Sequence, residues 1–217
     1  MLSMYVTDNQ NNRLIEPYLK FATRKFIKKN TILYTQGEVG QGFYYILDGM
    51  VKISTLDFKK NCRILDISAS GKLIGEQSLT GHPYFTTATV IKDSVLYYFT
   101  IQTYNQFLQV NPDIRNFITK SILGKVKLHV SDLNVKSFPT ENQVAFYLLR
   151  LLDIFSQDKI NLTQQELAKY TGLTRITIYR ILKKWEEEGI LSISNRKIYI
   201  LKPDILKHYV DSQYASN

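Results

Sequence analysis

The sequence predicts an α+β fold: an antiparallel, jelly-roll-like β-roll, then one long helix, then a winged helix-turn-helix. Three observations predict it. Short apolar or alternating runs separated by glycines occupy residues 25–100, a helical pattern without proline follows over 114–135, and two capped helices flank a glycine within 163–185. Alternation with a period of two is typical of strands, and apolar spacings of three and four are typical of helices.

The strands of the roll are predicted from its apolar runs. These runs cover residues 31–34, 42–47, 50–54, 64–67, 86–90 and 95–99. The turns between them need positive φ or close backbone approach, and they hold the glycines at 37, 40, 42, 49, 71, 75 and 81. We expect a short helix on either side of the roll, over 14–21 and over 103–110.

Asn-Pro-Asp at 111–113 predicts the start of the long helix, because proline is tolerated in a first helical turn. A helix of about 24 residues is roughly 36 Å long, which is more than a small domain needs to cover itself. We therefore interpret its apolar stripe as the seam of a homodimer, with packing against the roll alone as the alternative. The stripe consists of Ile118, Ile122, Val126, His129 and Leu133.

A hinge at 136–140 and a further helix lead to the helix-turn-helix. Thr163 and Glu166 form a capping-box pattern, Gly172 suits a left-handed turn, and Thr174 caps the second helix. Two alternating runs after Gly189 predict a hairpin, which would form a wing with a basic tip. The order of helix, glycine turn, helix and basic hairpin favours DNA binding.

The second helix of this pair has an apolar face that should form core. Its N-terminal half is then left exposed, where side chains can enter a major groove: Arg175, Ile176, Tyr179 and Arg180. We expect phosphate contacts, which position the protein without specifying a sequence, from Thr163, Gln164, Thr174, Thr177 and Lys197.

Charge and composition narrow the classes of partner and cofactor. The formal net charge of +9 favours an acidic partner, of which nucleic acid is the commonest and an anionic membrane surface the next. A single cysteine excludes an internal disulfide framework and any four-cysteine metal or iron-sulfur site within one chain. The N-terminal segment does not look like a signal peptide, and no long apolar run occurs, so we expect a cytoplasmic protein.

Enzymatic activity is not expected, because paired catalytic carboxylates, a phosphate-cradling glycine loop and a nucleophile motif are all missing from the sequence. The alternative to a DNA-binding regulator is a ligand-binding or adaptor module that does not engage DNA. Exposure of Arg175 and Arg180 on one basic face with Lys197 would favour the regulator.

Four segments resemble the Crp/Fnr family of bacterial transcription regulators, within residues 26–201. GEVGQGFYYILDGMVKI, starting at residue 37, resembles the β-roll signature, IGEQSL the effector-pocket turn, FLQVNPDI the start of the dimerisation helix, and LTQQELAKYTGLTRITIYRILKKWEEEGIL the DNA-binding signature. The resemblance implies an allosteric homodimer that binds a palindromic site in duplex DNA. It also implies RNA polymerase as a partner if the protein is an activator, through the segment 155–159.

We therefore expect three parts. They are an effector-sensing β-roll over 1–110, a dimerisation helix with its hinge over 111–136, and a DNA-binding domain over 137–217.

The resemblance also bears on the effector. Family members that bind cyclic AMP carry Gly-Glu followed by Arg-Ser, and the arginine pairs with the cyclic phosphate. Here Gly75 and Glu76 are retained, Thr86 and Thr87 replace Arg-Ser, and His129 falls near the position that reaches adenine. Loss of a charge-assisted bidentate partner commonly costs a few kcal/mol.

We therefore expect a small organic effector other than cyclic AMP in this pocket, or no effector, with Glu76 as a structural carboxylate in the second case. An iron-sulfur cluster is not expected, haem is unsupported, and we assign no metal ligand.

The half-site read by the second helix should also depart from the family's usual one. Arg175 and Arg180 match two arginines that read DNA in family members, whereas Ile176 replaces a glutamate. A guanidinium can pair with guanine, but isoleucine can only pack on a thymine methyl group. We therefore expect the half-site to keep a guanine and to change at the base that the glutamate reads.

Overall fold

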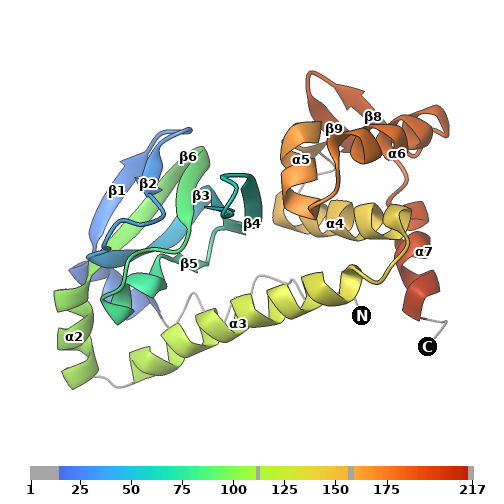
Figure 1. Ribbon diagram of the computed structural model, residues 1–217. Coiled ribbons are helices and arrows are strands. Elements are labelled where there is room, and N and C mark those ends of the chain that lie inside the picture. Colours follow the sequence, from blue (N-terminus) through green and yellow to red (C-terminus); the bar gives the residue numbers. More distant parts are fainter. Residues whose placement is uncertain (1–14, 111–112, 156–158, 215–217) are drawn as a thin grey trace. The chain divides into compact units, whose positions relative to one another are not determined.

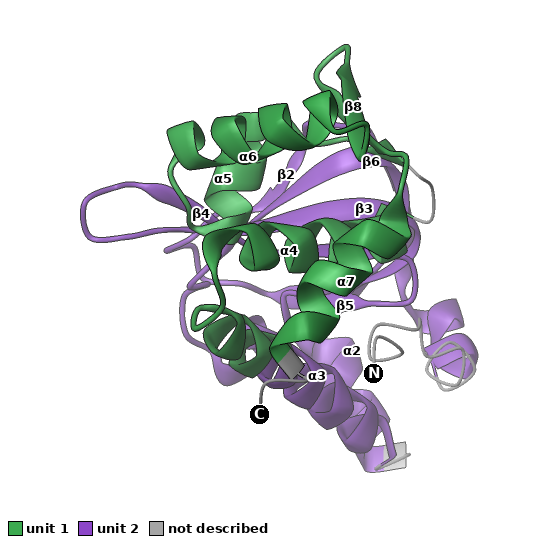
Figure 2. Ribbon diagram, turned by 90° about the vertical axis from the view of Figure 1, so that its right-hand side faces the viewer, with its two compact units in different colours: residues 1–6, 128–217 green, residues 7–127 purple. Residues whose placement is uncertain are grey.

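The computed structural model describes residues 15–110, 113–155 and 159–214. The chain forms two compact units that divide between Lys127 and Leu128 (Figure 2). One unit is built on an antiparallel sheet and the other on helices with a small sheet, so the predicted α+β class is confirmed.

The first unit is a β-roll whose main sheet has the strand order β1-β6-β3-β4, with β2 paired to β6 and β5 paired to β3 (Figure 1). Its described strands all pair antiparallel. The strands are β1 (Thr23–Ile27), β2 (Ile32–Tyr34), β3 (Gly42–Leu56), β4 (Cys62–Ala69), β5 (Leu73–Ile74) and β6 (Thr87–Thr100). The 3₁₀ helix η2 (Glu16–Phe21) precedes them, and a second one, η3 (Glu76–Thr80), follows β5.

Two of the predicted strand boundaries are wrong. The runs 42–47 and 50–54 belong to the single strand β3, and the runs 86–90 and 95–99 belong almost entirely to β6. Gly49, at φ 111°, lies where the β3–β6 register shifts, and a Cβ there would come within 2.0 Å of the Ser94 Oγ. This glycine therefore allows a bulge within a strand instead of ending it.

Two helices complete the roll, α2 (Ile101–Val110) and α3 (Asp113–Val135). Both agree with the predicted helices, although Asn111 and Pro112, the expected start of α3, lie outside the described residues, as does Leu14 at the start of the first predicted helix. One apolar cluster joins the sheet to these helices through Phe43, Phe99, Phe107, Phe117 and Ile118. A second cluster fills the interior of the roll and includes Tyr34, Ile46, Val51, Tyr84 and Leu96.

The second unit contains four helices and a three-stranded sheet of order β7-β9-β8 among its described residues. Its elements are α4 (Thr140–Phe155), β7 (Lys159–Ile160), α5 (Gln164–Thr171), α6 (Arg175–Glu187), β8 (Leu191–Ser194), β9 (Lys197–Ile200) and α7 (Pro203–Tyr214). The short strand β7 was not predicted, and most of the predicted loop before it, residues 156–158, lies outside the described part of the chain. Fully buried side chains form the core, among them Val144, Leu148, Leu167, Ile178, Leu182, Trp185 and Leu206.

An ion pair connects the last turns of α3 to α4 within this unit. The guanidinium of Arg150, only 1% exposed, donates to Asp132 Oδ1 at 2.6 Å. Burial by itself would raise the pKa of Asp132, but hydrogen bonds from His129 and Arg150 and the charge of Arg150 hold it below its usual value. The sequence did not indicate this pair, because Arg150 follows apolar residues on a helix that is buried over most of its length.

Candidate DNA interface and effector turn

The local geometry of α5 and α6 follows from their caps. The Thr163 hydroxyl accepts the N–H of Glu166 at 3.2 Å, and the Glu166 carboxylate accepts the N–H of Thr163 at 3.1 Å, so the predicted capping box is confirmed. Gly172 takes the left-handed conformation, at φ 74°. The Thr174 hydroxyl then accepts the N–H of Thr177 at 3.1 Å and starts α6.

Helix α6 separates its apolar and exposed faces as predicted. Ile178, Ile181, Leu182 and Trp185 are buried. The side chains of Ile176 and Tyr179 are 64% and 50% exposed, and Arg175 and Arg180 are also exposed. Residues three or four positions apart are neighbours on a helix, which holds for Arg175–Tyr179, Ile176–Tyr179 and Ile176–Arg180, so these four side chains form one surface.

The hairpin after α6 has a basic tip. Asn195 and Arg196 have φ values of 50° and 62°, as a two-residue type I′ turn requires, and Arg196 is exposed. Lys197, the first residue of β9, is half-buried. Glu186 Oε1 accepts the N–H of Ile193 at 2.8 Å and so attaches the hairpin to the C-terminal end of α6.

The cations near that end of α6 have carboxylate partners. Lys184 pairs with Glu141 at 2.9 Å, and Lys183 pairs with Glu187 at 3.9 Å. The exposed arginines of α6 lie instead in its first two turns. Within α6 and the hairpin, the exposed arginines therefore lie at the N-terminal half of the helix and at the hairpin tip.

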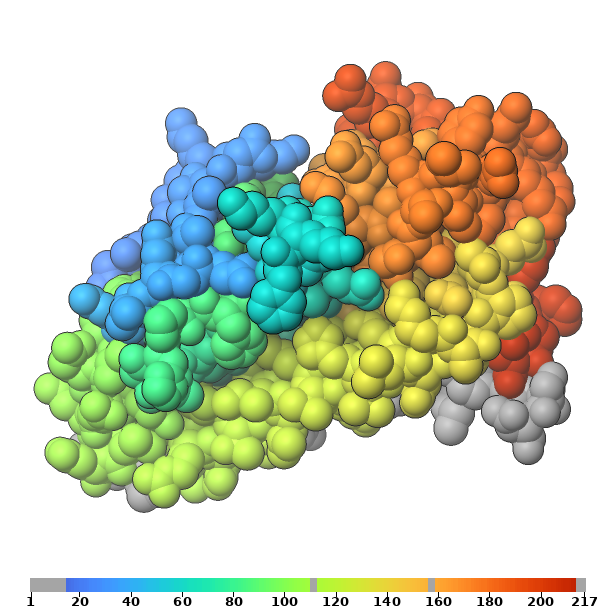
Figure 3. Space-filling model, in the orientation of Figure 1, coloured from blue at the N-terminus to red at the C-terminus, as the bar shows by residue number. Residues whose placement is uncertain are grey.

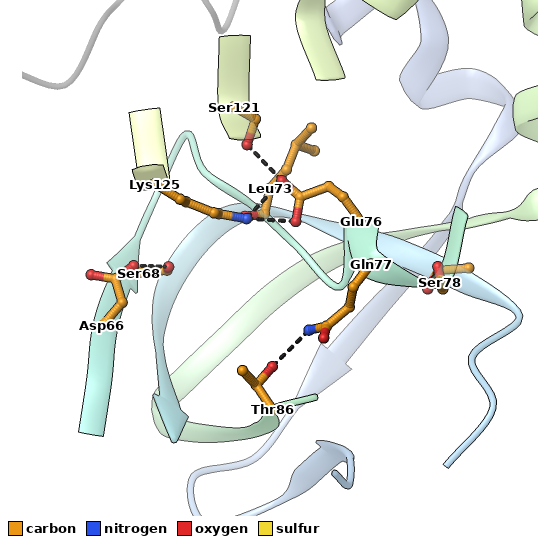
Figure 4. A network of polar contacts seen from close by, with 10 residues as sticks. Asp66, Ser68, Leu73, Glu76, Gln77, Ser78, Thr86, Ser121 and Lys125 are labelled. Carbon is orange, nitrogen blue, oxygen red and sulfur yellow. Dashed lines mark hydrogen bonds and ion pairs between the residues drawn. The ribbon is translucent and has the colours of Figure 1, made fainter. Parts of the chain in front are cut away.

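The turn between β5 and η3 holds a buried carboxylate. Gly75 has φ 83°, and Glu76, which follows it, is 5% exposed. The Lys125 ammonium of α3 lies 2.7 Å from Oε1 and 2.5 Å from Oε2 of Glu76, and the Ser121 hydroxyl donates to Oε1 at 2.6 Å (Figure 4). Burial alone would raise the pKa of Glu76, but the charge of Lys125 and these hydrogen bonds hold it below its usual value, so Glu76 is ionised.

The two threonines in place of Arg-Ser also have partners within the roll. Gln77 Nε2 donates to the buried Thr86 hydroxyl at 2.6 Å, and the N–H of Gln36 donates to the Thr87 hydroxyl at 2.9 Å. The side chain of Gln77 points away from that of Glu76 and reaches Thr86 (Figure 4). Neither threonine carries a charge with which a phosphate could pair.

The structure thus brings together Gly75, Glu76 and Thr86, three of the five predicted pocket residues, with Thr87 next to them in β6. His129 belongs to the other compact unit, where its side chain is 48% exposed and lies 3.7 Å from Asp132.

Sequence reasoning missed the partners of Glu76. Ser121 and Lys125 are four positions apart, which places them on one face of α3. A structural carboxylate inside a roll needs a partner, and that requirement is the signal that could have indicated a nearby cation.

The predicted seam stripe lies exposed along α3, apart from its first member. Ile118 is 5% exposed and packs in the core of its own roll, so we remove it from the seam. Ile122, Val126 and Leu133 are 45%, 52% and 72% exposed, and Leu123 and Val130, which were not predicted, are 60% and 50% exposed. Figure 3 shows side chains of the first part of α3, in yellow-green, at the surface of the first unit.

Within residues 15–110, 113–155 and 159–214, acidic, cysteine and histidine side chains form no group of three that could hold a metal ion. None of the described helices is both long and apolar enough to span a membrane.

Comparison with known families agrees with this architecture. Residues 24–111 match the model of the cyclic nucleotide-binding domain, and residues 142–209 match that of the Crp-like helix-turn-helix domain. A roll of the first kind followed by a domain of the second defines a class of DNA-binding transcription regulators. The chain belongs to the Crp/Fnr family.

Relatives that match most of the chain support the assignment. The chain is 23% identical over 191 residues to the cyclic AMP receptor protein of Thermus thermophilus, covering 87% of this chain and 88% of that protein. It is 26% identical over 185 residues to the cAMP-activated global transcriptional regulator CRP of Salmonella typhimurium, covering 81% and 88%. A solved CRP/FNR-family regulator from Thermus thermophilus has the same fold, with a TM-score of 0.77, 19% identity and coverage of 87% and 98%.

Proposed function

We propose that this transcription regulator binds a palindromic site in duplex DNA as a homodimer, with α6 in the major groove, and that cyclic AMP is not its effector. The observation that carries the DNA-binding part is the surface of Arg175, Ile176, Tyr179 and Arg180, exposed on a helix whose other face is core. This surface also argues against the adaptor alternative, which would not need exposed arginines at the start of α6.

The four exposed residues of α6 are the proposed contacts to the DNA bases. A guanidinium can bind guanine O6 and N7 together, so Arg180 is the first assignment for a base contact. Ile176 can pack on a thymine methyl group but can neither donate nor accept a hydrogen bond. The half-site should therefore contain guanine and should differ from that of relatives with a glutamate at this position.

The proposed contacts to DNA phosphates lie at the helix starts and in the wing. They are Thr163, Gln164, Thr174, Thr177 and Lys197. The hydroxyls of Thr163 and Thr174 already cap α5 and α6. A phosphate would therefore meet these residues at helix N-termini, where the positive end of the helix dipole attracts it.

Dimerisation is proposed through the exposed stripe of α3. Five apolar side chains that are at least 45% exposed on one helix form a surface that water solvates poorly. A second copy of α3 would cover it with an identical stripe, as a two-fold dimer requires. The paired chains would then present two copies of α6 to the two half-sites of a palindrome.

The case against cyclic AMP rests on Thr86 and Thr87. One relative is named as cAMP-activated, and family members that bind cyclic AMP pair its phosphate with an arginine that this chain replaces with threonine. Thr86 is buried and already bonded to Gln77. A phosphate placed there would be buried without a cation, which is costly.

Selection of bound fragments from random duplex DNA, at fixed moderate salt and without ligand, tests the proposal. We expect a palindrome with half-sites about one helical turn apart, each with a guanine. The same selection with Ile176→Glu should change the preferred base at one position of each half-site. Recovery of no sequence by the wild-type protein, with or without cyclic AMP, would point to a required effector of another kind or to the adaptor alternative.

A further inference from the structure

The effector turn is bound by the protein's own long helix. Glu76 in the turn and Lys125 in α3 are 49 positions apart in the chain, and both carboxylate oxygens of Glu76 lie within 2.7 Å of the ammonium. The side chain of Glu76 is 4% exposed and that of Lys125 is 35% exposed. This pair is therefore sheltered from solvent on the carboxylate side and is screened less than a surface ion pair.

The hydrogen-bonding capacity of the Lys125 ammonium is used up. An ammonium has three N–H donors, and this one reaches Glu76 Oε1, Glu76 Oε2 and the carbonyl oxygen of Leu73, the last at 2.9 Å. The carboxylate in turn accepts from both Lys125 and Ser121. A ligand hydroxyl could bind Glu76 only by displacing one of these partners.

The other polar side chains of the turn are also engaged. Gln77 uses its amide nitrogen on Thr86 and accepts the N–H of Phe85 at 2.8 Å with its amide oxygen. Next to them, the ring of Tyr34 stacks on that of Tyr84 at 4.1 Å between centroids, and both rings are buried. The polar side chains of the turn that resembles the family's effector turn thus satisfy one another.

We propose that Lys125 is a built-in ligand of the effector turn, which fixes α3 to the roll and makes DNA binding independent of a cyclic nucleotide. The inference rests on the proposed DNA-binding function and concerns the regulation of its effector site. In a regulator that needs a ligand, the bound ligand supplies the free energy that shifts the equilibrium of the long helices. Here the Glu76–Lys125 pair forms that connection within one chain.

Lys125→Met tests the proposal, because methionine keeps most of the side-chain length and removes the ammonium. We expect at least a tenfold loss of affinity for the selected DNA site and faster amide hydrogen exchange in Glu76–Thr80. Lys120→Met is the matched control, since Lys120 is an exposed lysine of the same helix. The affinity of the Lys120→Met variant for the selected DNA site, and its rate of amide hydrogen exchange in η3, should stay within about twofold of wild type. A twofold change in affinity corresponds to roughly 0.4 kcal/mol.

The double variant Glu76→Gln with Lys125→Met separates loss of the connection from loss of folding. It leaves no unpaired buried charge, so it should unfold close to the wild-type temperature and still bind DNA at least tenfold more weakly. Wild-type affinity in Lys125→Met would contradict the inference and leave the proposed function standing. A wild-type protein that binds its site only when cyclic AMP is added would contradict both the inference and the proposal that cyclic AMP is not the effector. Failure of the wild type to bind any duplex, with or without cyclic AMP, would instead contradict the proposed function.

Discussion

Arg180 is exposed one turn after the start of α6, and its guanidinium is the proposed reader of a guanine. Arg180→Ala should weaken binding to the selected site by about 1–3 kcal/mol, or roughly 5- to 150-fold, and should relax the preference at that guanine. Fluorescence anisotropy at constant salt, with the selected site and a site changed at the guanine, measures both effects.

Lys183→Ala is the control for this prediction. Lys183 is exposed on the same face of the helix, one turn beyond Tyr179, and pairs with Glu187, so it tests the loss of a nearby positive charge without loss of a proposed base contact. The affinity of the Lys183→Ala variant for both sites should stay within about twofold of wild type, because an exposed ion pair contributes little free energy. Equal losses on the two sites for Arg180→Ala would assign this residue to a phosphate instead of a base.

Single residues were predicted well where their neighbours are close in sequence. The exposure of Arg175 and Arg180 follows from a helical period, and the cap of α5 follows from Thr163 and Glu166, three positions apart. The partners of Glu76 could not be found in this way. They lie 45 and 49 positions away, and only the packing of α3 on the roll brings them close.

At the scale of elements, α3 is the helix whose surface predicts an oligomer. Val126→Glu places a carboxylate in the middle of the exposed stripe and, in a two-fold dimer, brings two like charges near each other. We expect the dimer dissociation constant to rise at least tenfold and the affinity for the palindrome to fall with it. Sedimentation equilibrium measures the first change.

Lys120→Glu adds the same side chain about 120° around the helix from Val126, calculated at 100° per residue. It should leave the dimer dissociation constant within about threefold of wild type. Dimers of wild-type strength in Val126→Glu would mean that another surface forms the dimer.

The helices were predicted more reliably than the shortest strands. Helices α3 and α6 carry enough residues for a periodic pattern to appear, whereas β5 and β7 have two residues each. Gly49 illustrates a different error, because a glycine at positive φ suits either a turn or a bulge. The pairing of β3 with β6, and not the local sequence, decides between them.

For the molecule as a whole, Glu76 and Asp132 predict how stability depends on pH. Both have pKa values below their ordinary ones, through Lys125 in one unit and through His129 and Arg150 in the other. A depressed carboxyl pKa contributes stability that is present above the unfolded-state pKa, about 4, and is lost as pH falls through the folded-state value. The unfolding temperature should therefore decrease as the pH is lowered below about 4.

The variant Asp132→Asn tests the predicted pH dependence of stability in the second unit. It leaves the buried Arg150 without this carboxylate and should cost about 3 kcal/mol at neutral pH. Its unfolding should also depend less on pH than that of wild type below pH 4, since asparagine does not titrate. Thermal unfolding of both proteins between pH 7 and pH 3 measures this difference, and identical acid dependence would contradict the assignment.

The sequence by itself determined the α+β class, the order of roll, long helix and helix-turn-helix, and the exposed surface of α6. These features depend on composition, on periodicity and on capping pairs within a few positions of each other, all of which are local. Tertiary structure alone decided that Ile118 belongs to the core, that β3 and β6 are continuous through a bulge, and that Lys125 neutralises Glu76. Each of these results depends on contacts between residues far apart in the chain, which form only when the sheet and the helices have packed.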